Sequence, residues 1–97
     1  MAKGYWVVVY YAVSDPARLA QYSATGGPAI EAAGGRILAR GTATRTFEGG
    51  ENRRTVVIEF DGVEQAIAAY QSPRYQAARE LLKGAVEREV RILEGVG

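Results

Sequence analysis

The stretch that decides the fold is GYWVVVYYAV, residues 4–13. Most of its residues are β-branched or aromatic, and apolar side chains occupy both the odd and the even positions. Side chains of a strand alternate between the two faces of a sheet, so this pattern predicts a strand that is covered on both faces. We therefore expect residues 4–13 to form a central strand with something packed against each side of it.

A helix pattern follows this strand. Asp15, followed by Pro16, is typical of an N-cap and a first helical turn. Apolar and small residues at steps of three and four then predict a helix up to the glycine pair at residues 34–35. Because an internal proline removes one backbone hydrogen bond, we expect Pro28 to kink or break this helix near Thr25.

A hairpin pattern comes next. Residues 36–47 are strand-like, and the polar, glycine-bearing residues 48–52 predict the connection to a returning strand over residues 53–60. In the returning strand Val56 and Ile58 point to the same face, because side chains two apart share a face. One face of this strand is therefore expected to be apolar.

The segment YQSPRYQAAR, residues 70–79, interrupts a second helix. Asp61 and Glu64 have the spacing of a capping box, which predicts the start of this helix. Ser72 then supplies a second N-cap and Pro73 a second first-turn proline. We expect two short helices at an angle to each other instead of one long helix.

A last strand over residues 87–95 completes the order strand, helix, strand, strand, broken helix, strand. This order predicts an α+β fold, a ferredoxin-like β-α-β-β-α-β domain with a four-stranded sheet, formed by residues 1–97 as a single domain. Helices cover only one face of such a sheet, yet the central strand has no polar face. Because large exposed apolar patches are rare on monomers, we expect a second copy of the chain to cover the other face and form a homodimer.

The composition excludes several kinds of chemistry. The chain has 97 residues, a net charge of +1, and neither cysteine nor histidine. These absences exclude thiol nucleophiles, disulfides, histidine relays and ordinary zinc sites. Its glycine pairs match no phosphate-binding or dinucleotide-binding fingerprint, so we expect no metal and no cofactor.

The charge and the apolar runs also limit the partners. No cluster of basic residues is longer than Arg53-Arg54, which argues against nucleic-acid binding. The longest apolar run is too short to cross a bilayer, so no membrane association is expected. A cytoplasmic location is the default expectation.

Two charged residues in the predicted strands are candidates for catalysis. Arg40 could hold a carboxylate or an enolate in a two-point contact. Glu59 lies between Ile58 and Phe60, an apolar setting that can raise the pKa of a carboxyl group and suit it to proton transfer. The structural alternative is an ion pair between Arg40 and Glu59 on neighbouring strands, or a solvated Glu59.

Aromatic residues are candidates for substrate binding. Tyr22 and Tyr70 fall on the packing stripes of the predicted helices, where a core role is the ordinary one. Together with Trp6 they could instead converge on a cavity for a flat organic molecule. Ser72 is better explained as a helix cap than as a nucleophile, because no histidine is present to activate it. We include Ser72 with Trp6, Tyr22 and Tyr70 as a candidate substrate contact.

Motifs along nearly the whole chain resemble those of the uncharacterised domain-of-unknown-function 1330 family. They are Tyr5-Trp6, Asp15-Pro16, Tyr22, Pro28, Gly34-Gly35-Arg36, Arg40-Gly41, Val57-Ile58-Glu59-Phe60, Tyr70, Ser72-Pro73, Tyr75-Gln76 and Glu94-Gly95. The resemblance implies a place among the dimeric α/β barrels, a superfamily that includes cofactor-free monooxygenases, haem-degrading enzymes, muconolactone isomerases and relatives of chlorite dismutase. It implies a dimer but no established activity.

These features predict a small homodimer that binds a small organic molecule between its sheet and its helices. Cofactor-independent proton transfer or monooxygenation is the expected chemistry, with Arg40 as the anchor and Glu59 as the proton carrier. The alternative is a non-enzymatic dimeric module, structural or regulatory, whose polar residues are caps and ion pairs. A cavity of about 300 Å³ or more that touches Arg40 or Glu59 would favour the first hypothesis, and a filled core with an ion pair between them would favour the second.

Overall fold

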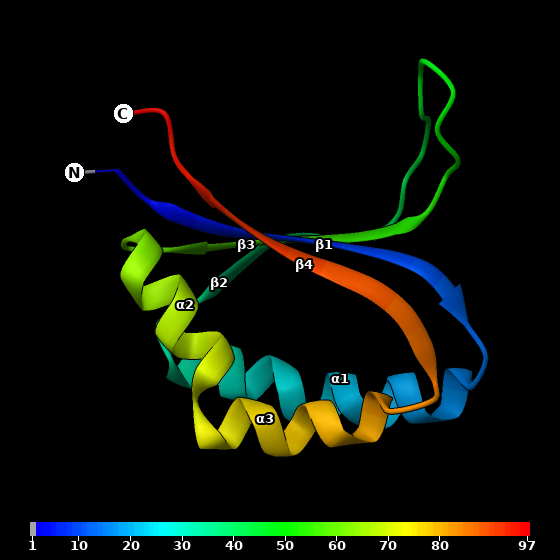
Figure 1. Cartoon of the computed structure of the whole chain (residues 1–97), viewed down its shortest axis with the longest axis horizontal. Helices are drawn as coiled ribbons and strands as arrows, with labels where there is room; N and C mark the ends of the chain where they lie inside the picture. The colour runs from blue at the N-terminus through cyan, green and yellow to red at the C-terminus, as the bar shows by residue number, and fades with distance from the viewer. Residues whose placement is uncertain (1) are drawn as a thin grey trace.

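The computed structural model describes residues 2–97. The elements in chain order are β1 (Gly4–Val13), α1 (Pro16–Ala32), β2 (Arg36–Thr42), β3 (Arg54–Phe60), α2 (Val63–Gln71), α3 (Pro73–Arg79), the short 3-10 helix η1 (Glu80–Leu82) and β4 (Val86–Glu94) (Figure 1). The strands form one antiparallel sheet in the order β2-β3-β1-β4. The predicted α+β, ferredoxin-like topology is confirmed.

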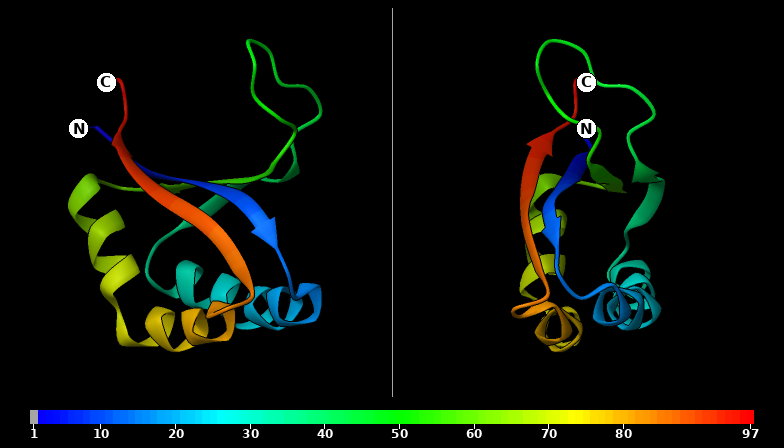
Figure 2. Two further views of the ribbon diagram at one scale, coloured as in Figure 1. Left: turned by 45° about the vertical axis from the view of Figure 1, so that its right-hand side comes forward. Right: turned by 90° about the vertical axis from the view of Figure 1, so that its right-hand side faces the viewer.

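The helices all lie on one face of the sheet (Figures 1 and 2). We call this side the helix face and the other side the open face. Residues 43–53, which connect β2 to β3, project away from the sheet on the open-face side. No helix within residues 2–97 is long and apolar enough to cross a membrane.

Strand β1 is central, as its pattern predicts, because it pairs with β3 on one side and with β4 on the other. Its even-numbered side chains Trp6, Val8 and Tyr10 are buried under the helices. Its odd-numbered neighbours Tyr5 and Val7 lie on the open face and are only half-buried. The helix face of this strand is therefore packed within the chain, while no element within residues 2–97 covers the open face.

Aromatic rings form the centre of the core. Tyr75 is completely buried, and its ring centroid lies 5.0 Å from that of Trp6 and 5.4 Å from that of Tyr70. The indole N–H of Trp6 donates to the backbone carbonyl of Ala66 at 2.7 Å. This bond satisfies the one polar atom of the indole, so the ring can be buried without an unpaired donor.

The predicted break in the second helix is present. The backbone N–H of Tyr75 donates to Ser72 Oγ at 3.3 Å, so Ser72 caps α3. Pro73 then occupies the first turn of α3. At the other predicted start, Asp15 Oδ1 accepts from the backbone N–H of Arg18 at 3.1 Å and caps α1.

Two predicted boundaries are wrong. The predicted capping box of Asp61 and Glu64 does not form, because the N-cap of α2 is Gly62, which makes no side-chain hydrogen bond. The backbone N–H of Asp61 instead donates to Gln65 Oε1 at 3.0 Å. Strand β2 ends at Thr42, five residues before the predicted position 47. Only one further backbone bond, from the N–H of Ala43 to the carbonyl of Arg53, extends the pairing, because the following residues leave the sheet.

Helix α1 does not break near Thr25, because Pro28 lies inside a single helix that runs to Ala32. The proline removes the bond that the carbonyl of Ala24 would accept four residues earlier. Ala24 and Pro28 are both exposed, so water can satisfy that carbonyl. The packing of α1 on the sheet therefore outweighs the local preference of proline.

Replacing each of the two neighbouring glycines of α1 by alanine should change the stability of the fold in opposite directions. A Cβ on Gly26 would lie 2.8 Å from the Tyr22 ring, whereas one on Gly27 would meet nothing within 4 Å. We expect Gly27→Ala to raise the free energy of unfolding by about 0.5–1 kcal/mol, because alanine is the better helix former. Gly26→Ala should lower it by about 1–3 kcal/mol through overpacking. Urea denaturation measures both, and equal stability of the two variants would contradict the placement of the Tyr22 ring.

Candidate functional site

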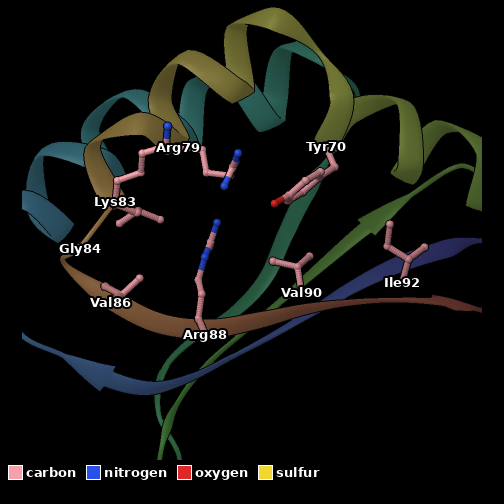
Figure 3. A pocket seen from close by; sticks show the side chains of 9 residues that line it. Tyr70, Arg79, Lys83, Gly84, Val86, Arg88, Val90 and Ile92 are labelled. Carbon is pink, nitrogen blue, oxygen red and sulfur yellow. The ribbon is translucent and has the colours of Figure 1, made fainter.

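A pocket of about 500 Å³ lies between the α3–η1 segment and strand β4 (Figure 3). Its lining comprises Tyr70, Arg79, Leu82, Lys83, Gly84, Val86, Arg88, Val90 and Ile92. In Figure 3 Arg88 extends from β4 into this space on the side of Arg79, and the Tyr70 hydroxyl points into it. Because β4 is an edge strand of the sheet, the pocket is open to solvent along that edge.

Among the described residues, three cationic side chains and no carboxylate line this pocket. They are Arg79, Lys83 and Arg88. Arg79 donates through Nε to Gln76 Oε1 at 2.9 Å, so its bonded partner is a neutral amide. Lys83 pairs at 2.9 Å with Glu80, on the solvent side of η1. Within residues 2–97 neither arginine of the pocket has a carboxylate partner, so the lining keeps an uncompensated positive charge.

Arg88 is held in place by tyrosine hydroxyls. Its Nη2 donates to the Tyr75 hydroxyl at 2.9 Å, and its Nη1 donates to the Tyr10 hydroxyl at 3.4 Å. The hydroxyls of Tyr75 and Tyr22 are themselves hydrogen-bonded at 2.7 Å. Burial raises the pKa of Tyr22, so this phenol stays neutral. The guanidinium is therefore oriented by neutral groups, and its charge is available to a ligand.

A second and smaller cavity of about 30 Å³ lies between α1 and the sheet. It touches Trp6, Tyr10 and Tyr22, and three arginines, Arg40, Arg54 and Arg88, supply its charge. Arg88 thus borders both cavities.

The sequence matches the family model described as Domain of unknown function (DUF1330) over residues 3–96. The chain belongs to the DUF1330 family. No curated protein matches it.

Solved structures resemble this DUF1330 chain in fold. A protein of unknown function from Rhodopseudomonas palustris superposes with a TM-score of 0.77 at 17% identity, covering 99% of this chain and 84% of that one. A putative antibiotic biosynthesis monooxygenase from Caulobacter crescentus gives 0.64 at 13% identity, with 99% and 92% covered. A dimeric ferredoxin-like protein of unknown function from Thermobifida fusca gives 0.64 at 16% identity, with 95% and 90% covered. At these identities the likeness shows the fold alone.

The two predicted catalytic residues of this DUF1330 chain lie on opposite faces of the sheet. Arg40 pairs in register with Val56 and lines the small cavity on the helix face. Glu59 lies on the open face, where it accepts from the Tyr5 hydroxyl at 2.9 Å and from Arg36 Nε at 3.1 Å. One ligand molecule inside a single chain therefore cannot contact both Arg40 and Glu59.

Glu59 has a different partner and a different pKa from those expected. The structural alternative of an ion pair between Arg40 and Glu59 is wrong, because Glu59 pairs with Arg36. The hydrogen bond from Tyr5 and the Arg36 guanidinium lower the pKa of Glu59 below its ordinary value. Ile58 and Phe60, which were expected to raise this pKa, point to the helix face instead.

Of the predicted substrate contacts, only Tyr70 lines the α3–β4 pocket. Trp6 and Tyr22 belong to the buried core and border the small cavity. Ser72 caps α3, and its hydroxyl also donates to the carbonyl of Ala69 at 2.8 Å. Whether any of these side chains binds a substrate stays a prediction.

Sequence reasoning missed the basic residues of the α3–β4 pocket in this DUF1330 chain. One of them had a signal: Arg88 stands two residues from Val86 and from Val90, so it interrupts the apolar row of the last strand. A charge in such a row is a candidate for a function inside the fold. Arg79 and Lys83 had no such signal, because only the placement of η1 beside β4 brings them to the pocket.

Proposed function

We propose that this DUF1330 chain binds a small organic anion in the pocket between α3 and β4. The observation that carries the proposal is a lining with three cationic side chains and no carboxylate, in a pocket of about 500 Å³. Pockets that bind small molecules usually measure about 300–1,000 Å³. The size and the charge of this pocket therefore both suit a small anionic ligand.

The pocket also suits a particular kind of anion. Leu82, Val86, Val90 and Ile92 supply an apolar wall next to the basic groups. An arginine can hold a carboxylate through two parallel hydrogen bonds, whereas an apolar wall favours a hydrocarbon body. We infer that the ligand is a carboxylic acid with an aromatic or branched aliphatic body.

The geometry supports binding more strongly than it supports a reaction. Two structures of this fold, at 13% and 15% identity, are described as putative antibiotic biosynthesis monooxygenases, which makes monooxygenation a candidate by analogy only. Tyr70 provides the one hydroxyl among the lining residues, and no carboxylate is present there to act as a base. Proton transfer by Glu59 would require a second site on the open face. The non-enzymatic alternative, a regulatory binding module, is therefore the form of the hypothesis that we favour.

We also propose that the open face pairs with a second copy of the chain. Val7 and Val57 stand opposite each other in register at the centre of this face, and Leu93 beside them is 52% exposed. The charged groups of this face are paired and involve the edge strands of the sheet: Arg91 of β4 pairs with Glu89, and Arg36 of β2 pairs with Glu59 of β3. An apolar centre with a polar rim is the usual anatomy of a dimer interface. The dimeric protein from Thermobifida fusca has the same fold and gives an analogy for this assembly.

Replacing Arg79 should weaken the binding of an aromatic acid. We expect phenylacetate to bind the wild-type chain, and Arg79→Gln to raise its dissociation constant about tenfold or more, because a charge-assisted hydrogen bond is lost. Isothermal titration calorimetry measures this change. The matched control is Arg74→Gln, which removes an exposed arginine of the same helix that borders the outer α1–α3 groove and not the pocket.

A neutral ligand completes the test. Phenylacetamide has the shape of phenylacetate without its charge, so we expect it to bind much more weakly. Equal binding of the two compounds, or an equal loss of affinity in Arg74→Gln and Arg79→Gln, would overturn the proposal of an anion site in this pocket.

A further inference from the structure

We propose that the small cavity beneath α1 is a second anion site, which holds one small monovalent anion among Arg40, Arg54 and Arg88. The anion is the size of a halide or of a single carboxylate group. This proposal does not depend on the organic-anion pocket, since it rests on another cavity and on two arginines, Arg40 and Arg54, that do not line that pocket.

The first argument is the uncompensated charge of the cavity. Its lining contains three arginines and no carboxylate, and within residues 2–97 Arg40 and Arg54 form no ion pair. Charges that are taken out of water need a partner of opposite sign or strong hydrogen bonds. Arg54 and Arg88 are half-buried while Arg40 is exposed, and the tyrosine hydroxyls that bind Arg88 carry no negative charge. Within residues 2–97 no carboxylate pairs with these arginines, so an anion from solution is the simplest source of negative charge here.

The second argument is an unsatisfied donor. The Nε atom of Arg54 is buried and has no hydrogen-bond partner within residues 2–97. Buried N–H groups are almost always paired, and a charged one is especially costly to leave unpaired. An acceptor placed in the cavity beside Arg54 would satisfy this donor.

The third argument is the arrangement around Tyr10. The guanidinium carbons of Arg54 and Arg88 both lie 5.6 Å from the centroid of the Tyr10 ring. Arg88 is the register partner of Tyr10 on one side, and Arg54 lies on the neighbouring strand on the other. A ring face attracts each cation but does not neutralise the repulsion between them. An anion that contacts both arginines would offset the repulsion between their charges.

The size of the cavity selects the ligand. A volume of about 30 Å³ is room for one or two water-sized particles. An aromatic acid with its ring does not fit, so this site and the α3–β4 pocket bind different ligands although Arg88 borders both. Halides, and the carboxylate of formate, are small enough to enter.

The tryptophan of the chain provides a direct test. Trp6 is the only tryptophan, is 1% exposed and borders the cavity. A buried indole is shielded from collisions with dissolved iodide, so quenching that saturates with iodide concentration would report an ion bound beside it. We expect saturable quenching of Trp6 fluorescence, competed by chloride and by formate but not by the bulky gluconate at the same sodium concentration.

Variants locate the bound ion. Arg54→Gln should raise the iodide concentration needed for half-saturation at least tenfold, whereas Arg74→Gln, which removes an exposed arginine that lines neither this cavity nor the α3–β4 pocket, should leave it unchanged. If circular dichroism shows that Arg54→Gln is unfolded, Arg40→Gln replaces it, because that side chain is exposed and also borders the cavity.

Three results would overturn the proposal. They are quenching that rises linearly without saturation, quenching that chloride does not compete, and saturation that is lost in Arg74→Gln but kept in Arg54→Gln. If phenylacetate does not bind, only the proposal of the organic-anion pocket is contradicted. If quenching of the wild type does not saturate with iodide, only the proposal of this second site is contradicted.

Discussion

Replacing Tyr75 by alanine should lower the free energy of unfolding by about 3–5 kcal/mol, the cost of deleting a buried aromatic ring. The side chain is 0% exposed and packs at 5.0 Å from Trp6 and 6.1 Å from Tyr22, between ring centroids. Its removal opens a cavity at the point where the rings from β1, α1 and α2 meet. Urea denaturation followed by Trp6 fluorescence measures the loss.

Tyr75→Phe distinguishes the contribution of the hydroxyl to stability from that of the ring. This variant keeps the packing but leaves the Tyr22 hydroxyl and Arg88 Nη2 without the bonds of 2.7 Å and 2.9 Å that Tyr75 makes with them. We expect it to cost about 1–3 kcal/mol, the range for an unsatisfied buried polar group. A loss below about 1 kcal/mol for Tyr75→Ala would contradict the central place of this ring in the core.

Val7→Lys should convert the proposed dimer into a monomer. Val7 lies at the centre of the open face, in register with Val57 on β3 and with Arg91 on β4. In a dimer a lysine there would be buried beside another cation, which should raise the dimer dissociation constant at least about 100-fold. In the monomer the same lysine can extend into water, so the fold should survive. Analytical ultracentrifugation at micromolar concentration measures the change.

The control for Val7→Lys puts the same charge on the other side of the molecule. Ala20→Lys adds a lysine at an exposed position of α1, and we expect it to leave the dimer intact. Leu93→Lys, on the open face, should weaken the dimer as Val7→Lys does. A wild-type chain that sediments as a monomer, or a Val7→Lys variant that stays dimeric, would show that the open face is not the interface.

Local signals in the sequence predicted much of the fold. The strand at residues 4–13 and the caps Asp15 and Ser72 are all present, because each depends on residues that are close together in the chain. The kink at Pro28 was predicted by the same kind of argument and is wrong. There the packing of the whole helix on the sheet outweighed one lost hydrogen bond.

The candidate site was less predictable than the fold. Arg40 and Glu59 were predicted to act at one catalytic site, with an ion pair between them as the structural alternative, and the paired strands do lie side by side. The register and an irregularity between Ile37 and Ala39 put their side chains on opposite faces. A shift of one residue reverses the face of every side chain that follows, and the sequence of one strand does not reveal such a shift.

The sequence by itself determined the order of elements, the central place of β1 and the lack of thiol and imidazole chemistry, because these follow from residue types and short-range periodicity. Only the tertiary structure decided that Arg79, Lys83 and Arg88 share one pocket and that Arg40, Arg54 and Arg88 share another. The physical reason is that each cluster joins side chains from different strands or helices. Their proximity depends on strand register and on how α1 and α3 pack against the sheet.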